Sequence, residues 1–304
     1  MKKIEVYEVG PRDGFQSIGE YIPLETKIQI IDGLLSAGIK HLQITSFVSP
    51  KAIPQMKDAR DLAENCVKKH PEADFFALVP NLRGAEAAWK SGLKWITYVV
   101  SLSESHNRAN INRSHNESFA ELQKILKAYA DMDVCLDLAT TFGCPFEGKK
   151  REKDVLPFLE PYVDCGIRTV NLCDTIGIAN PAQVRNIIDA VRNEYPSLDL
   201  QVHIHDTRNM GMVNTLAAIE QGVCKVQSTL GGLGGCPYAP GASGNLATED
   251  LAFMLSEMGY EINIDVLKMI ELARYQAEAI PEGQFSGHLY TVTDRCQEHY
   301  INNA

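Results

Sequence analysis

Short runs rich in β-branched and aromatic residues recur along the whole chain, and segments of a different periodicity separate them. In those segments apolar residues recur at helical spacing, as at Ile28, Ile31, Leu34 and Leu35. The runs that we interpret as strands begin near Ile4, His41, Asp74, Trp95, Asp133, Thr169, Leu200 and Lys225. The pattern therefore predicts an α/β protein in which strands and amphipathic helices alternate.

Glycine closes several of the predicted helices just before the next strand begins. These residues are Gly38, Gly92, Gly166 and Gly222. They fit helix C-caps, where the backbone often takes a left-handed conformation. A doubly wound sheet also alternates strands and helices, but the number of strands favours a closed (β/α)8 barrel, the TIM barrel fold.

No linker or block of charge divides the chain, which predicts a single domain. Two further helical stretches, 248–257 and 264–279, follow the eighth strand. We expect a TIM-barrel catalytic domain over residues 1–280 that includes these extra C-terminal helices. Proline and glycine punctuate residues 281–304, which we expect to form a loosely packed tail or a contact between subunits.

Composition narrows the class of protein further. A chain of 304 residues with 45% hydrophobic and 22% charged residues can build a large apolar core. The formal net charge of -10 gives no footprint for nucleic acid or for an anionic membrane, which leaves a small molecule as the expected partner. Without a signal-peptide pattern or a membrane span, the expected location is cytoplasmic. The eight cysteines form no CxxC pair and are interpreted as reduced thiols.

Polar residues gather where the predicted strands end. In a parallel barrel the C-terminal strand ends carry the active site, so these residues are candidates for chemistry. They are Arg12 and Asp13 after the first strand, Asp174 and Thr175 after the sixth, His203 and His205 in the seventh, and Asn245 beyond the eighth.

His203 and His205 are the most informative pair. Residues i and i+2 of a strand point to one face, so both imidazoles project together. With Asp13 from the first strand and the amide oxygen of Asn245, they make a mixed nitrogen and oxygen set that suits Mg²⁺, Mn²⁺ or Zn²⁺. The alternative is that one histidine only forms hydrogen bonds at the top of the barrel.

The segment 231–245 is too rich in glycine for a helix or a strand and too long for a tight turn. We expect a mobile loop over the barrel mouth, or else a flexible connection without chemistry. It lacks the signatures of nucleotide-binding loops. Cys236 on this loop is either an acid or base in the shielded site or an ordinary surface thiol.

Several motifs together resemble the 3-hydroxy-3-methylglutaryl-CoA lyase family, a group of metal-dependent barrel lyases. The resemblance runs from about Val6 to about Met254 and rests on VGPRDG (9–14), TSFVSPKAIPQM (45–56), GCPFEG (143–148), DTIG (174–177), HIHDT (203–207) and GLGGCPYAPGASGNLATED (232–250). It implies an acyl-CoA substrate and a homodimer.

The resemblance also implies roles for individual residues. Asp13, His203, His205 and Asn245 would hold Mg²⁺ or Mn²⁺. Arg12 would bind the thioester oxygen and stabilise the enolate, Asp174 would assist near the substrate, and Cys236 would be the catalytic loop thiol. The residues that we expect to contact the substrate are Arg12, Gln16, Gln43, Asp137 and Thr175.

Departures from the family pattern concern the walls of the site. Gln43 stands where the family carries a glutamate, and Cys135 and Asp137 stand where it carries an arginine and a tyrosine. Gln43 cannot act as a base, whereas Asp137 adds a carboxylate. The metal set is complete, so the expectation is retained carbon–carbon bond cleavage, with either the family substrate or an altered one.

Three functions remain open from the sequence. The first is a carbon–carbon lyase that cleaves 3-hydroxy-3-methylglutaryl-CoA to acetyl-CoA and acetoacetate. The second is a related lyase or aldolase for a different hydroxyacyl-CoA or hydroxy acid, and the third is a non-catalytic metabolite-binding barrel. The basic run Lys149, Lys150 and Arg151 either meets the CoA phosphates or is a solvated surface patch.

Overall fold

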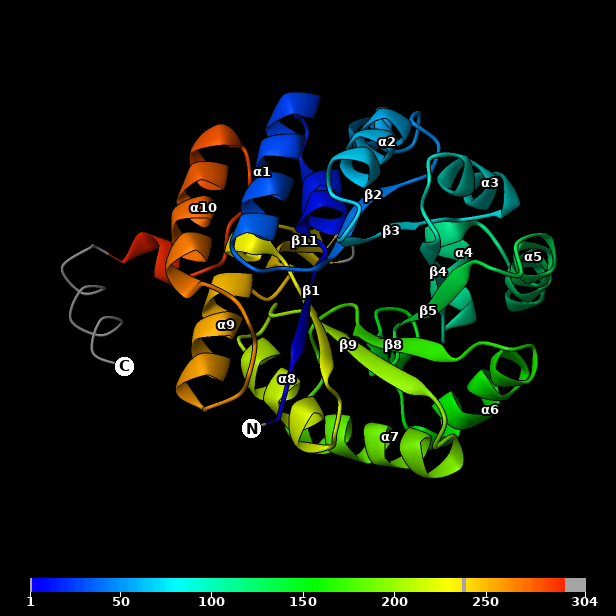
Figure 1. Cartoon of the computed structure of the whole chain (residues 1–304). Helices are drawn as coiled ribbons and strands as arrows, with labels where there is room; N and C mark the ends of the chain where they lie inside the picture. The colour runs from blue at the N-terminus through cyan, green and yellow to red at the C-terminus, as the bar shows by residue number, and fades with distance from the viewer. Residues whose placement is uncertain (1, 237–238, 293–304) are drawn as a thin grey trace.

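Eight parallel strands close into a barrel in a computed structural model that describes residues 2–236 and 239–292, with the side chains of 236–243 outside that description (Figure 1). The strands neighbour one another in the order β1-β10-β9-β8-β5-β4-β3-β2. Their bounds are β1 Glu5–Glu8, β2 His41–Ser46, β3 Asp74–Leu78, β4 Trp95–Ser101, β5 Asp133–Ala139, β8 Thr169–Asp174, β9 Asp199–Ile204 and β10 Lys225–Ser228. The predicted TIM barrel and its strands are confirmed.

Helices surround the barrel, and all of them except α4 bury apolar residues against it (Figure 1). They are α1 Leu24–Ser36, α2 Ala59–Lys69, α3 Leu82–Lys90, α4 Glu104–Ile111, α5 His115–Ala128, α6 Glu152–Asp164, α7 Pro181–Glu194, α8 Gly211–Glu220, α9 Thr248–Glu257 and α10 Val266–Ala279. The predicted capping glycines have positive φ. At Gly38 a Cβ would also collide with the backbone oxygen of Asn263, so the site needs glycine.

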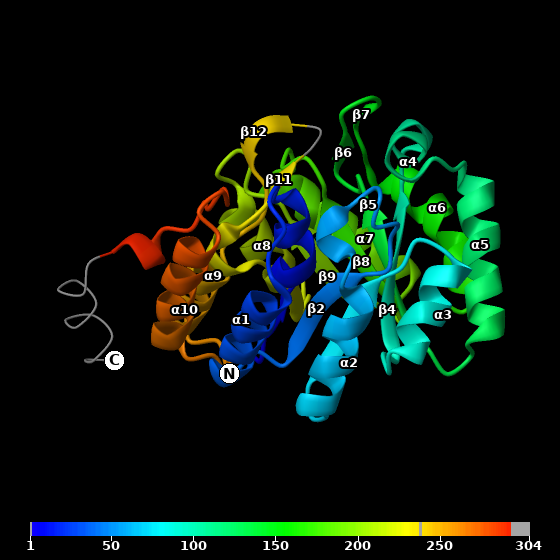
Figure 2. The same cartoon turned by 90° about the horizontal axis from the view of Figure 1, so that it is seen from above.

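Two short hairpins stand at the same end of the barrel, opposite the N-terminus (Figure 2). One joins β6 (Gly143–Cys144) to β7 (Gly148–Lys149), and the other joins β11 (Gly235–Cys236) to β12 (Ala239–Ser243). The expectation that the segment 231–245 contains no strand is therefore wrong. Glycines 231, 232 and 234 take positive φ and make the bends, which leaves the following residues extended and able to pair.

The stretch 281–292 lies against the loop after β10, whereas we expected a loosely packed tail or a contact between subunits. The backbone N–H groups of Ser286 and Gly287 donate to the Gly231 oxygen at 3.1 and 2.9 Å. Phe285 packs onto Gly231, where any side chain would occupy the space of the ring. Residues 293–304 lie outside the described part of the chain. Among the described residues, no helix has the length and apolar character needed to cross a membrane.

Candidate active site

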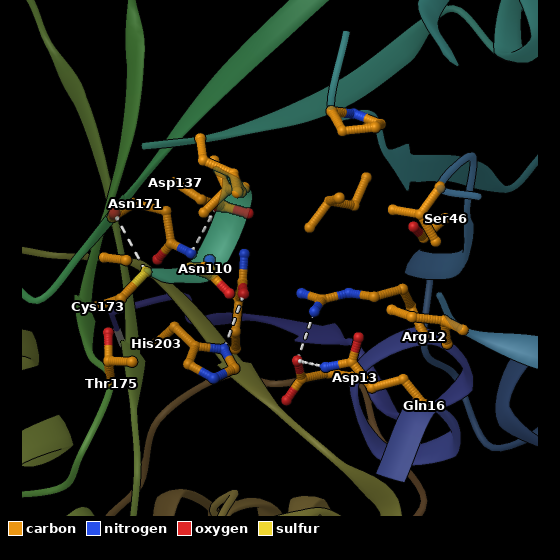
Figure 3. A pocket seen from close by; sticks show the side chains of 18 of the residues that line it. Arg12, Asp13, Gln16, Ser46, Asn110, Asp137, Asn171, Cys173, Thr175 and His203 are labelled. Carbon is orange, nitrogen blue, oxygen red and sulfur yellow. Dashed lines mark hydrogen bonds and ion pairs between the residues drawn. The ribbon is translucent and has the colours of Figure 1, made fainter. Parts of the chain in front are cut away.

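A cavity of about 240 Å³ opens at the C-terminal ends of the barrel strands. Among the predicted site residues, its lining includes Arg12, Asp13, Gln16, Asp137, Thr175, His203 and His205. Figure 3 shows Arg12 and Asp13 pointing toward each other, with His203 facing them and Asp137, Asn171 and Cys173 on the opposite wall. The barrel thus brings together most of the residues that the sequence placed at strand ends.

The turn that carries Arg12 and Asp13 is a single π-helical turn, η1 (Gly10–Gly14). Glu8 anchors it from the end of β1, because its Oε1 atom accepts the N–H groups of Gly10 at 2.8 Å and of Leu230 at 3.0 Å. Its Oε2 atom accepts the Thr248 hydroxyl at 2.6 Å. One buried carboxyl group therefore ties the turn after β1 to the loop after β10.

His203 and His205 project from β9 and the residue after its end, and both are buried. Their Nε2 atoms lie 3.0 Å apart, and each histidine offers a nitrogen within 4.8 Å of an Asp13 carboxylate oxygen. Burial lowers the pKa of His205 to about 3, so this imidazole is neutral and keeps a lone pair. The i, i+2 prediction of two converging imidazoles is confirmed.

Asp13 receives hydrogen bonds from three side chains. Arg12 donates through Nη1, Gln16 through Nε2 at 2.9 Å and Asn245 through Nδ2 at 2.7 Å. Burial alone would raise the pKa of Asp13, but the Arg12 guanidinium and the Asn245 hydrogen bond help to lower it to about 2. The carboxylate is therefore ionised throughout the neutral range.

These groups fit a divalent cation. Asp13, His203 and His205 form the group of three potential ligands found in the described residues. The Oδ1 atom of Asn245 is buried and has no hydrogen-bond partner among the described residues, which makes it a further candidate ligand atom. The amide nitrogen, not this oxygen, faces Asp13, so Asn245 must turn its amide before Oδ1 can coordinate.

Gln43 lies behind Arg12 and does not line the cavity. Its Oε1 atom accepts the Arg12 Nε–H, and its Nε2 atom donates to Thr97 Oγ1 at 2.8 Å. On the opposite wall, Asn171 Nδ2 donates to Asp137 Oδ1 at 2.9 Å. Burial raises the pKa of Asp137. Gln43 is thus placed to orient Arg12. Gln43 and Asp137 both depart from the family pattern, but only Asp137 lines the cavity in the described structure.

Two of the predicted catalytic residues, Asp174 and Cys236, are not among the described residues that line the cavity. Asp174 is buried and accepts the N–H groups of Ile178 at 3.1 Å and Ala179 at 3.0 Å, so it holds the loop after β8. Burial raises its pKa to about 6. Cys236 belongs to β11, and its side chain lies outside the described part of the chain.

Several residues that line the cavity were not predicted from the sequence. His106 of α4 lines it, its Nδ1 atom lies 2.7 Å from Ser101 Oγ, and burial lowers its pKa to about 4. Asn171 and Gln227 face inward from β8 and β10. Period-two alternation with the strand-end residues could have identified both strand positions. His106 carries no comparable signal, because it lies on a helix inserted after β4.

The basic run that begins in β7 lies apart from this cavity. Lys149, Lys150 and Arg151 line a separate surface hollow together with Gln183 of α7. Lys150 forms an ion pair with Glu147 at 2.6 Å, which reduces the charge available to a ligand.

Comparisons with known proteins agree with this geometry. The HMGL-like family model matches residues 3–275. The hydroxymethylglutaryl-CoA lyase of Bacillus subtilis is 40% identical over 279 residues, which span 91% of this chain and 93% of that protein. A crystal structure of the B. subtilis HMG-CoA lyase has a TM-score of 0.90 at 38% identity, over 95% of this chain and 97% of that one. An HMG-CoA lyase from Acinetobacter baumannii in complex with coenzyme A and 3-methylmalate has a TM-score of 0.89 at 38% identity, over 95% of both chains. The chain belongs to the HMGL-like family and is a carbon–carbon lyase of the hydroxymethylglutaryl-CoA lyase type.

Proposed function

We propose that the protein cleaves 3-hydroxy-3-methylglutaryl-CoA to acetyl-CoA and acetoacetate with the help of a divalent cation. The observation that carries the proposal is the convergence of Asp13, His203 and His205 beside Arg12 at the barrel mouth. The hydroxymethylglutaryl-CoA lyases that match most of the chain support the acyl-CoA substrate. We further propose Mg²⁺ or Mn²⁺ as the native ion, with Zn²⁺ as an alternative, because the donors mix nitrogen and oxygen.

Asp13, His203, His205 and Asn245 would hold the cation. When bound, it would polarise the substrate hydroxyl and carboxylate oxygens and lower the barrier to losing the hydroxyl proton. Arg12 supplies the second positive charge. Its guanidinium stays charged at any working pH and is held by Gln43 on one side and Asp13 on the other. In this position Arg12 is suited to stabilising an enolate oxygen.

The reaction moves two protons. The 3-hydroxyl group loses its proton as the C2–C3 bond breaks, and the bonding electrons move into the thioester enolate. The enolate carbon then takes up a proton to give acetyl-CoA. Asp137 is a candidate for one transfer, because its carboxyl group faces the cavity and burial raises its pKa. Direct roles for Cys236, Asp174, Gln16 and Thr175 stay predictions.

A panel of hydroxyacyl-CoA esters tests the proposal. The protein is stripped with a chelator, reloaded with Mg²⁺, Mn²⁺ or Zn²⁺, and assayed for CoA-ester cleavage. Rapid, metal-dependent formation of acetoacetate from the methylglutaryl ester is the expected result. Failure of every ester despite stoichiometric metal binding would contradict catalysis and favour a metabolite-binding barrel.

A second candidate keeps the chemistry and changes the acyl group. It is a lyase or aldolase for another hydroxyacyl-CoA or hydroxy acid. Asp137 supports this candidate, since a carboxyl group on the cavity wall favours a substrate that can donate a hydrogen bond there. In the panel, faster turnover of a different ester would favour it. The homodimer, the cytoplasmic location and contact of the basic run with CoA phosphates also stay predictions.

A further inference from the structure

A chain of side-chain amides runs down the inside of the barrel from His203. His203 Nδ1 lies 3.0 Å from Gln227 Oε1, and these residues pair in register on neighbouring strands β9 and β10. Gln227 Nε2 in turn donates to Gln201 Oε1 at 3.3 Å. All three side chains are buried, so bulk water does not compete for these hydrogen bonds.

The direction of this chain decides which nitrogen of His203 carries the proton. Because the Gln227 amide nitrogen is directed to Gln201, its oxygen faces His203 and needs a donor there. His203 Nδ1 must then carry the hydrogen, which leaves the Nε2 lone pair facing His205 and Asp13. A ring nitrogen that coordinates a metal must be unprotonated, so this is the tautomer that a cation requires.

His205 is held differently. Its Nδ1 atom is buried and has no hydrogen-bond partner among the described residues, whereas its Nε2 atom lies 3.0 Å from His203 Nε2. With the lone pair of His203 directed at that contact, His205 must be the donor and carry its hydrogen on Nε2. The two imidazoles are therefore inequivalent, and His203 is the one that is ready to bind a cation.

We propose that Gln227 is a positioning residue for the metal centre, and that Gln201 fixes the direction of its amide. The proposal deepens the proposed function, since it rests on a cation at Asp13, His203 and His205. Gln227 acts through His203, as partners of metal-binding histidines generally do by fixing the tautomer and the ring orientation. Without the Gln201 contact, the Gln227 amide could turn over and present a donor to His203.

The hydrogen-bonded series of amides ends at Gln201, whose Nε2 atom is buried without a partner in the described structure. Gln201 lines a second cavity, of about 460 Å³, at the N-terminal ends of the strands together with His41, Trp95 and Lys225. A buried N–H group without an acceptor is destabilising. An acceptor in this lower cavity, such as a water oxygen, would therefore favour the amide direction that keeps Nδ1 of His203 protonated.

The test reads the tautomers of the metal-free protein by long-range ¹H–¹⁵N NMR and, separately, the affinity for Mn²⁺ by electron paramagnetic resonance. In the unmodified protein we expect hydrogen on Nδ1 of His203 and on Nε2 of His205. Gln227→Met should allow His203 to populate the other tautomer and should weaken Mn²⁺ binding about 10- to 100-fold. Gln201→Met should have a smaller effect in the same direction, because it removes only the contact that fixes the amide.

Two variants serve as controls. Gln227→Glu keeps an oxygen acceptor for His203 and should preserve both the tautomer and most of the affinity. Cys66→Ala truncates a buried residue of α2 that lies outside the amide chain and the cavity, and should leave both readouts unchanged. If His203 keeps hydrogen on Nδ1 and Mn²⁺ binds equally well in Gln227→Met, the proposal is overturned. Because the tautomer is read without metal or substrate, that outcome is independent of whether the protein cleaves an acyl-CoA.

Discussion

Asn245 donates its amide hydrogen bond to the Asp13 carboxylate at 2.7 Å, although 232 residues separate the two along the chain. Asp13 follows the first strand of the barrel and Asn245 follows the hairpin after the last, so this contact joins the two ends of the closed sheet. In a barrel the first and last strands are neighbours, which is why residues so distant in sequence can share one site.

Asp13→Asn should abolish tight metal binding. The substitution keeps the shape of the side chain and removes the carboxylate charge of the three-ligand group. We expect Mn²⁺ affinity, measured by electron paramagnetic resonance, to fall about 100-fold or more. Asn245→Ala should weaken binding less, because it removes a neutral ligand. Equal Mn²⁺ affinity in Asp13→Asn and the unmodified protein would place the cation elsewhere.

Arg12→Lys should lower kcat about 100- to 1,000-fold, the size typical of losing one group that stabilises an oxyanion. An ammonium group cannot hold Gln43 and Asp13 through separate nitrogens of one planar group, as Arg12 does. Steady-state assays with the methylglutaryl ester give kcat and KM. A change confined to KM would show that Arg12 binds the substrate without stabilising the transition state.

Gln43→Leu should lower kcat about 10-fold or more, because Arg12 loses the acceptor of its Nε–H group. Gln43→Glu is the matched variant, since it keeps an oxygen at that position and should retain more activity than leucine. Assaying both variants on several hydroxyacyl-CoA esters also shows whether this residue selects the acyl group. Equal activity of the leucine and glutamate variants would rule out an orienting role.

Buried Glu249 should make the protein less stable as the pH rises. Burial, with Asp250 nearby, raises its pKa from 4.5 to about 8, so between these values the folded state keeps a proton that the unfolded state releases. The free energy of unfolding must then fall with rising pH, by on the order of 5 kcal/mol across that window. Glu249→Gln keeps an oxygen for the Gly231 N–H and should reduce the slope. Urea unfolding at several pH values measures it, and a variant with the original slope would contradict the assignment.

The fold and the convergence of the candidate metal ligands could be predicted because they depend on local pattern. Strands, helices and the i, i+2 geometry of His203 and His205 follow from periodicity, and barrel closure then brings Asp13 to them. The places of Gln43 and Gln227 could not be predicted, since each depends on which way a buried side-chain amide turns. The β11–β12 hairpin was missed because glycine content says little about whether an extended segment finds a partner.

The proposal that a cation binds at Asp13, His203 and His205 can be tested by anomalous diffraction from crystals grown with Mn²⁺. The expected result is one strong anomalous peak within coordination distance of Asp13, His203 and His205, with the Asn245 amide turned so that Oδ1 faces the ion. Fully active, Mn²⁺-loaded protein whose anomalous peak lies away from these three side chains would contradict it.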